Sequence, residues 1–337
     1  MQVNSQRQSI FKKNNKLRKR KQNLNTPIIV LSIMIIASSI LFLSLGINSG
    51  SVEYALSKRI PRLIAIVLTG TCIGFSTMIF QTITDNRILT PSIMGIDSLY
   101  VAIQTILIFI FGSSSVFVSD KKLNFLICVV FMVIGSLGLY KLVFKKENTN
   151  IMFLLLVGMI CGTFFKSLSS FMQMVIDPNE YLILQGKLFA SFGNVNVEIL
   201  LLSMIIILLI VPFIYDDIKY FDVMSLGKDQ AINLGVDYDK LMRKSLIIIS
   251  ILVAVSTALV GPVTFLGILV ANISREMIKT YKHSYLITVS ILVSIFTLVF
   301  GQLMIERVLN LSTPVSVIIN MIGGVYFMYL LYKESRI

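Results

Sequence analysis

The chain has 337 residues, of which 55% are hydrophobic and 14% charged, and its mean hydropathy is +0.85. This composition excludes water-soluble domains and indicates a membrane protein. A transmembrane helix needs about 20 mainly apolar residues, so a chain of this length can hold roughly ten spans. The net charge of +13 does not indicate nucleic-acid binding, because the cytoplasmic loops of membrane proteins are enriched in Lys and Arg.

Residues 1–26 carry eight basic side chains and no acidic one. This segment predicts a disordered cytoplasmic tail beside anionic lipid. A signal peptide would also place basic residues before an apolar run, but the run over 28–47 is long enough to span and no cleavage-site pattern follows it. We therefore expect an uncleaved first helix.

Apolar runs recur along the rest of the chain and predict an all-α polytopic membrane domain over residues 27–335. The expected helices cover about 27–47, 61–81, 95–112, 123–144, 151–174, 197–215, 244–263, 264–280, 284–304 and 314–332. Ten spans place both termini on one side, and the basic tail makes that side the cytoplasm. This topology puts 22 of the 30 Lys and Arg residues inside, as the positive-inside rule requires.

Two small-residue patterns occur within the predicted spans. Gly70 and Gly74 share one helix face with Thr77 and Gln81, and Gly158 and Gly162 repeat the spacing of four. Small residues at this spacing let two helices approach closely, so helix packing is the default interpretation.

A polar stripe runs along the predicted helix over 151–174. Its members, at helical spacing, are Thr163, Lys166, Ser167, Ser170 and Gln173. A charge within a span normally faces water or a partner, which favours a pathway-lining role for Lys166. The alternative is a lysine whose stem reaches along the helix to the membrane surface.

The longest connection between spans, at about 216–244, is amphipathic and too polar to cross the membrane. Gly227 and Gly235 can end a short helix over Lys228–Leu234. Such a helix is either a docking element for a cytosolic partner or an ordinary interfacial loop, and this segment alone favours neither.

The chain lacks the residues for its own metal or nucleotide site. One histidine and three scattered cysteines cannot form a Cys/His metal cage or a disulfide framework. Gly186-Lys187 is followed by Leu188 and Gly227-Lys228 by Asp229, so no phosphate-binding loop exists. We expect that the chain binds no cofactor, that any metal arrives chelated, and that any ATP is bound by a partner.

Three stretches together carry a resemblance to a known family. The first, and most specific, is Arg59-Ile60-Pro61-Arg62-Leu63 followed by Gly70, Gln81, Asn86, Pro91 and Gly95. The second is Leu226-Gly227-Lys228-Asp229-Gln230-Ala231 with Leu234-Gly235-Val236. The third runs from Gly261-Pro262-Val263-Thr264-Phe265-Leu266-Gly267 through Asn272 and Arg275 to Arg307, Pro314 and Gly323-Gly324. They resemble the permease subunits of iron-chelate and vitamin B12 ABC importers, the FecCD or BtuC-like family, across nearly all of the chain.

The chain also departs from the usual family pattern. It has Asn86-Arg87-Ile88-Leu89 where the family usually has N-P-L-A, and Val270-Ala271-Asn272 where it often has V-P-H. Departures of this kind resemble the branch that serves catecholate or mixed siderophores of the petrobactin and anguibactin type. The resemblance therefore favours a ferric siderophore over vitamin B12.

The resemblance implies a BtuC-like type II ABC importer permease in the bacterial cytoplasmic membrane, with both termini in the cytoplasm. The implied partners are a second permease subunit, identical or paralogous, two ATP-binding subunits that hold ATP and Mg²⁺, and a lipid-anchored or periplasmic siderophore-binding protein. Iron would cross only as the chelate, and the chain itself would do no chemistry.

The resemblance also implies site residues. The residues that would dock the binding protein are Arg59, Arg62 and Arg307. The alternative is that these arginines only anchor the chain in lipid headgroups. ATPase coupling falls on Leu226, Gly227, Asp229, Gln230, Ala231, Leu234 and Gly235. To the translocation pathway we assign Gln81, Asn86 and Pro91 together with Lys166, Ser167, Ser170 and Gln173.

Rival classes of protein remain. An ion-coupled secondary transporter would need carboxylates within its spans, and only Asp97 and Glu276, near helix ends, come close. A membrane-embedded hydrolase would need a nucleophile and a base, and His283 is expected to lie alone in a loop. A non-transporting membrane scaffold stays open, because the absence of motifs does not argue against it.

Overall fold

The computed structural model describes residues 24–45, 52–143, 151–193, 195–308 and 313–334, and every regular element within these ranges is a helix. The expected disordered tail lies almost entirely outside the described residues. The main helices are α2 (Asn25–Ser44), α3 (Val52–Ile83), α4 (Ile96–Phe111), α6 (Lys121–Val143), α7 (Ile151–Val175), α9 (Val197–Tyr215), α12 (Tyr238–Val260), α13 (Leu266–Met277), α14 (His283–Leu303) and α15 (Val315–Glu334). Each overlaps one of the ten expected spans, which confirms the all-helical membrane fold.

Eight of these helices, among the described residues, are long and apolar enough to cross a membrane. The exceptions are α4, with 16 residues, and α13, with 12. At 1.5 Å per residue, α13 is about 18 Å long, well short of the roughly 30 Å hydrocarbon layer. The helix α12 ends where the Val260 carbonyl oxygen accepts from the Ser191 amide, whereas α14 begins at the other end of the bundle, where His283 contacts Asp222. The chain therefore returns across the bundle between them, partly as the non-helical segment 261–265 and partly as the short helix α13.

Two helices begin earlier than the apolar pattern indicates. The helix α3 begins at Val52 rather than near residue 61, so Pro61 lies inside it. The helix α12 begins at Tyr238 rather than at residue 244, and the Asp237 side chain caps it by accepting a hydrogen bond from the Lys240 backbone amide. Polar first turns extend both helices beyond the apolar segment that the sequence reveals.

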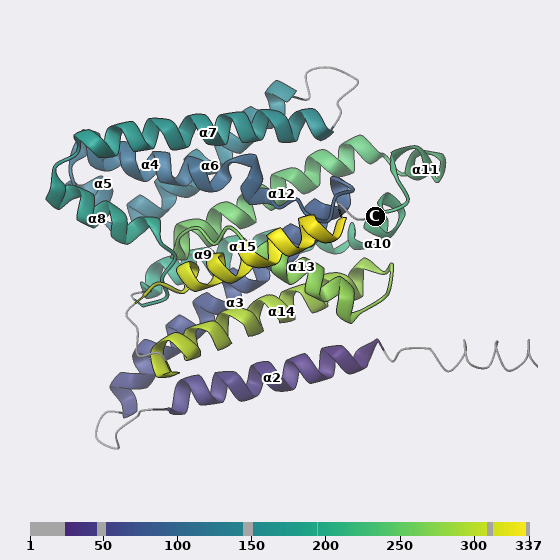
Figure 1. Cartoon of the computed structure of the whole chain (residues 1–337), viewed down its shortest axis with the longest axis horizontal. Coiled ribbons are helices and arrows are strands. Elements are labelled where there is room, and N and C mark those ends of the chain that lie inside the picture. The colour runs from purple at the N-terminus through teal and green to yellow at the C-terminus, as the bar shows by residue number, and fades with distance from the viewer. Residues whose placement is uncertain (1–23, 46–51, 144–150, 194, 309–312, 335–337) are drawn as a thin grey trace, which may run out of the picture.

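The remaining elements are short. They are the 3₁₀ helix η1 (Pro91–Met94), α5 (Val116–Ser119), α8 (Pro178–Leu188), α10 (Ile218–Met224), α11 (Lys228–Asn233) and the π-helical turn η2 (Met304–Val308). In Figure 1, α10 and α11 lie at the end of the bundle where α2 begins and α15 ends, and α5 and α8 lie at the opposite end. We call these the α11 end and the α8 end.

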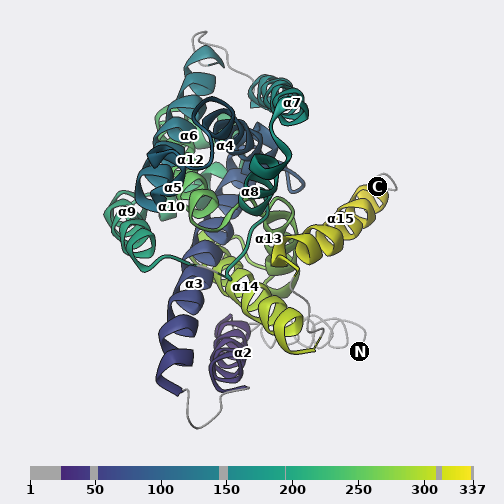
Figure 2. The ribbon, with the colours of Figure 1, turned by 90° about the vertical axis from the view of Figure 1, so that its left-hand side faces the viewer.

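The centre of the bundle is α3, which packs against α12 on one side and α14 on the other. The helices α4, α6 and α7 form a group beside α12, whereas α2 lies at the far edge against α14. Figure 2 shows α7 and α15 on one side of the molecule and α9 on the other. The buried apolar side chains form two clusters, one around α3, α4, α6 and α12 and the other around α13 and α14.

The glycine patterns mark close contacts between helices. A Cβ atom at Gly74 would lie 2.8 Å from the Ser290 carbonyl oxygen of α14, and one at Gly70 would lie 3.0 Å from the Ile295 amide nitrogen. A Cβ at Gly158 would lie 2.9 Å from the Met94 Cα atom of η1. These distances are too short for any side chain, so the packing interpretation is confirmed.

Candidate functional site

Arg59, the first residue of the most specific motif and one of the predicted docking arginines, caps the end of helix α2 at the α8 end. Its Nη1 donates to the carbonyl oxygens of Leu43 and Leu45, both at 2.8 Å. The last carbonyl groups of a helix lack intrahelical donors, and a cation also suits the negative end of the helix dipole. Arg59 therefore has a structural role at the end of α2, whatever else it contacts.

Arg62 and Arg307 lie near Arg59, as the docking hypothesis requires. Arg62 Nη1 is 3.5 Å from Glu306 Oε1, and its Nη2 donates to the Gly193 carbonyl oxygen at 2.6 Å. Arg307, Arg62 and Glu306 are all electrostatic neighbours of Arg59. The structure thus gathers the three arginines in one cluster and adds Glu306, which the sequence analysis missed although it directly precedes Arg307.

The predicted short helix in the long connection is confirmed as α11, which covers Lys228–Asn233. Gly227 and Gly235 flank it with φ angles of 98° and 85°, a region that favours glycine. Leu226 and Leu234 are 52% and 64% exposed, whereas Ala231 is fully buried against the bundle. The segment therefore presents apolar side chains outward at the α11 end, with Asp229 and Gln230 also exposed.

The helix before this segment, α10, is tied to the bundle by the single histidine. Asp222 Oδ1 accepts from the His283 backbone amide at 2.6 Å and lies 2.9 Å from His283 Nδ1. His283 Nε2 lies 2.8 Å from Thr82 Oγ1 of α3. The expectation that His283 lies alone in a loop is wrong, because it is the buried first residue of α14 and its partners are remote in sequence.

The polar stripe of α7 lies on the face of that helix that does not pack against the rest of the bundle. Thr163, Lys166, Ser167 and Ser170 are all exposed, while Gln173 is half-buried and donates to Thr105 Oγ1 at 3.2 Å. Exposed Phe164 and Phe171 are interspersed with this stripe along the helix. The stripe is therefore free to face a second subunit, a water-filled route or lipid.

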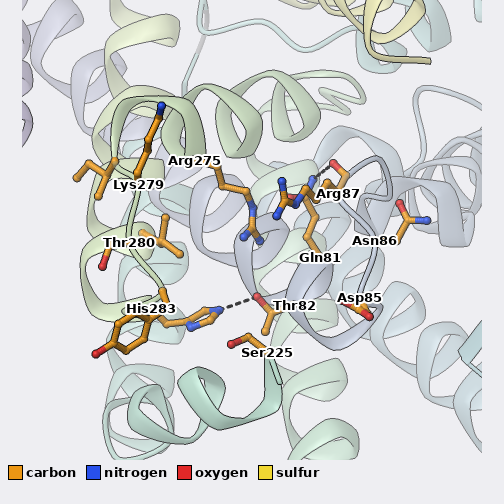
Figure 3. A pocket seen from close by; sticks show the side chains of 13 residues that line it. Gln81, Thr82, Asp85, Asn86, Arg87, Ser225, Arg275, Lys279, Thr280 and His283 are labelled. Carbon is orange, nitrogen blue, oxygen red and sulfur yellow. Dashed lines mark hydrogen bonds between the residues drawn. The ribbon is translucent and has the colours of Figure 1, made fainter. Parts of the chain in front are cut away.

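The other three residues assigned to the pathway lie elsewhere. Gln81 is buried and donates to the Arg87 carbonyl oxygen at 2.6 Å, and Asn86 Oδ1 accepts from the Ile88 amide at 2.9 Å. Both line a cavity of about 570 Å³ that no α7 residue lines (Figure 3). Pro91 is the buried first residue of η1. The structure does not bring the seven assigned residues onto one surface.

No group of three or more His, Cys, Asp or Glu side chains is placed to hold a metal ion in the described part of the chain. Cys72 and Cys128 are buried free thiols, and Cys161 is half-buried.

Comparison with known proteins identifies the family of this helical bundle. Residues 25–333 match the model of the FecCD transport family, and the chain belongs to this family. Petrobactin import system permease protein YclO of Bacillus subtilis (strain 168) is 57% identical over 287 residues, which cover 85% of this chain and 91% of the relative. Petrobactin import system permease protein FatC of Bacillus anthracis is 35% identical over 291 residues, covering 86% and 82%.

Solved structures share the fold. A chain described as an inward-facing conformation of a metal-chelate type ABC transporter superposes with a TM-score of 0.80, at 23% identity, over 92% of this chain and 99% of that one. PsaBC from Streptococcus pneumoniae in complex with Fab gives a TM-score of 0.55 at 14% identity, over 82% and 93%. The fold expected from the resemblance is confirmed, and the family argues against the secondary-transporter and scaffold alternatives.

Proposed function

We propose that this chain is the permease subunit of an ABC importer that moves a ferric siderophore across the bacterial cytoplasmic membrane, with ferric petrobactin as the first substrate to test. The observation that carries the proposal is the FecCD family match over residues 25–333, together with the 57% identity to a petrobactin import permease. The described residues form a helical bundle, and the relatives are named as permease proteins, so we assign ATP hydrolysis to a partner subunit.

Uptake in cells tests this function. A strain that lacks the chain and its relatives should lose accumulation of radiolabelled iron supplied as ferric petrobactin, and the wild-type chain should restore it. A panel of catecholate, hydroxamate and citrate chelates would define the substrate. Restored uptake of none of these chelates would contradict the proposal.

The proposed assembly has two permease subunits, two ATP-binding subunits and an extracellular siderophore-binding protein, either lipid-anchored or periplasmic. The exposed leucines of the α11 segment support docking of an ATPase subunit there, because exposed apolar side chains rimmed by polar ones mark interaction sites. ATP and Mg²⁺ would bind to that partner and not to this chain.

The proposed orientation puts the α11 end in the cytoplasm and the arginine cluster outside. Arg87, Lys141 and Arg275 support it, since they lie on segments at the α11 end, together with the Lys and Arg residues of 219–244. Both termini would then be cytoplasmic.

Arg62→Glu should weaken capture of the siderophore-binding protein by at least about tenfold, because a reversed charge repels an acidic partner surface. Arg59 is a poorer target, since its loss would uncap α2. Membrane insertion should be unchanged, and co-purification with the binding protein at two salt concentrations measures the effect. The swap Arg62→Glu/Glu306→Arg rebuilds the internal ion pair, so recovery of full binding by this double variant would remove the docking role of Arg62.

Lys166→Gln should lower the efficiency of uptake of an anionic ferric chelate about fivefold, which corresponds to about 1 kcal/mol for one partly screened charge. Uptake rates measured over a range of chelate concentrations separate affinity from maximal rate. Lys141→Gln, an exposed lysine near the end of α6, is the matched control. Unchanged uptake by Lys166→Gln would instead assign Lys166 to the lipid-facing surface.

A further inference from the structure

The cavity at the α11 end carries basic residues to which the transport proposal gives no role except as support for the orientation. It lies between the end of α3, the segment that follows it, the end of α13 and the beginning of α14, and its volume is about 570 Å³. Cavities of roughly 300–1,000 Å³ commonly hold small ligands in proteins. The space is therefore large enough for an inorganic anion or for the headgroup of a phospholipid.

Three cations and one carboxylate line this cavity. The cations are Arg87, Arg275 and Lys279, and the carboxylate is Asp85. Within the described ranges, none of the three basic side chains has an ion pair or a hydrogen bond to an acceptor. Arg87 and Arg275 are also close enough to repel each other.

Arg275 gives the sharpest sign that an acceptor is missing. Its Nε atom is buried and has no hydrogen-bond partner among the described residues. A buried donor of a charged group that lacks an acceptor is costly, and a second cation nearby adds to that cost. A bound anion would remove both penalties at once.

The wall around Arg275 offers further donors. Figure 3 shows the guanidinium groups of Arg275 and Arg87 near each other, with Thr82 and His283 across from Arg275, while the exposed Lys279 lies at the edge of the lining with its amine turned away from both. Thr280, Tyr281 and Ser225 add hydroxyl groups to the lining. Both ring nitrogens of His283 already have partners in Asp222 and Thr82, so His283 forms part of the cavity wall and the arginines remain as the groups that can bind an anion.

We propose that this cavity binds a phosphate group, held by Arg275 and Arg87 with Lys279 at its mouth. Guanidinium groups match the geometry of phosphate oxygens through paired hydrogen bonds, and several cations are needed to offset its charge. The group could belong to inorganic phosphate or to the headgroup of an anionic phospholipid. Basic pockets at the inner leaflet bind such headgroups, and only this lipid source rests on the proposed orientation.

The test uses the full-length permease and its own buried thiols. Unfolding exposes Cys72 and Cys128, so a thiol-reactive dye reports the thermal midpoint in neutral detergent. Inorganic phosphate, titrated against chloride at constant ionic strength, should raise the midpoint by about 2–4 °C through preferential binding to the folded state. In a second arm, nanodiscs of phosphatidylcholine with phosphatidylglycerol are compared with phosphatidylcholine alone.

Two sets of variants decide the result. Arg87→Gln/Lys279→Gln changes only exposed side chains, and it should keep the ligand-free midpoint while losing the shift; Arg275→Gln should lose the shift as well. Lys141→Gln, a basic residue outside the cavity, should respond as the wild type does. A shift with phosphate, with phosphatidylglycerol or with both, lost in the cavity variants, supports the site and identifies the source. No shift in the wild type, or an equal shift in the cavity variants, overturns it, and neither result depends on siderophore transport.

Discussion

Replacing Gly227 and Gly235 together by alanine should reduce siderophore uptake per ATP hydrolysed by at least about tenfold. Gly227 has φ 98° and ψ 162°, and Gly235 has φ 85°, conformations that L side chains rarely adopt. Such strain costs about 1–3 kcal/mol per residue, and about 1.4 kcal/mol is a factor of ten in an equilibrium. A Cβ atom at either position would meet nothing within 4 Å, so the effect arises from the backbone alone.

The strain matters because α11 lies between two fixed points. On one side, α10 is held to α14 and α3 through Asp222, His283 and Thr82. On the other side, Lys228 and Asp239 form an ion pair at 3.1 Å that joins α11 to the first turn of α12. A change in the turns at Gly227 and Gly235 would reorient α11 against both connections and disturb its seating on the ATPase.

The measurement is ATP hydrolysis and siderophore uptake in the same proteoliposomes, containing the permease, the ATPase subunits and the binding protein. Gly138→Ala and Gly324→Ala are matched controls, because these helical glycines also have open space around a Cβ but do not have positive φ angles. They should leave coupling intact. If the Gly227/Gly235 double variant turned over with normal coupling, the segment would be only a linker.

Gly74→Ala should destabilise the bundle strongly and lower its thermal midpoint. The new Cβ would lie 2.8 Å from the Ser290 carbonyl oxygen and 2.9 Å from the Ile291 Cα atom, and backbone atoms cannot turn aside as a flexible side chain can. Separating α3 from α14 would also weaken the hydrogen bond from Ser290 Oγ to the Gly74 carbonyl oxygen, now 2.8 Å. Overpacking costs about 1–3 kcal/mol and a lost buried hydrogen bond about 1 kcal/mol, so together they remove a substantial part of the roughly 5–15 kcal/mol by which a folded domain is stable.

Yield after detergent extraction and the thermal midpoint measure this effect. The nearby thiol Cys72, buried in the same helix, should react with a thiol dye at lower temperature in the variant. Gly138→Ala in α6 again serves as the control. A variant with the wild-type yield and midpoint would show that α3 and α14 can separate at little cost.

The sequence revealed those features that depend on neighbouring residues. Apolar runs located all ten main helices, because burial in lipid requires a continuous apolar segment regardless of what it packs against. Gly227 and Gly235 marked the ends of α11 for a similarly local reason, since glycine favours the backbone angles found there. The helix bounds were less accurate, because the polar first turns of α3 and α12 carry no apolar signal.

The candidate sites were predicted in part. The docking arginines and the coupling segment came from motifs, and the structure gathers the arginines at the α8 end and exposes the leucines at the α11 end. The assigned pathway residues did not meet on one surface: Gln81 and Asn86 line a cavity away from the α7 stripe. Helical spacing places residues on a face, but it does not tell which neighbouring helix covers that face.

The sequence by itself determined a membrane bundle with about ten helices, a basic bias toward one side and no nucleotide loop of its own. Only the tertiary structure decided that Arg62 meets Glu306 across 244 positions and that His283 meets Asp222 across 61. It also decided that the buried Nε of Arg275 finds no acceptor among the described residues, with Arg87 nearby. The physical reason is that the free energy of transfer into lipid is a sum over the residues of each local segment, so it can be judged from neighbouring residues. A polar contact instead depends on which distant helices lie side by side, and the packing of their glycine and apolar faces decides that.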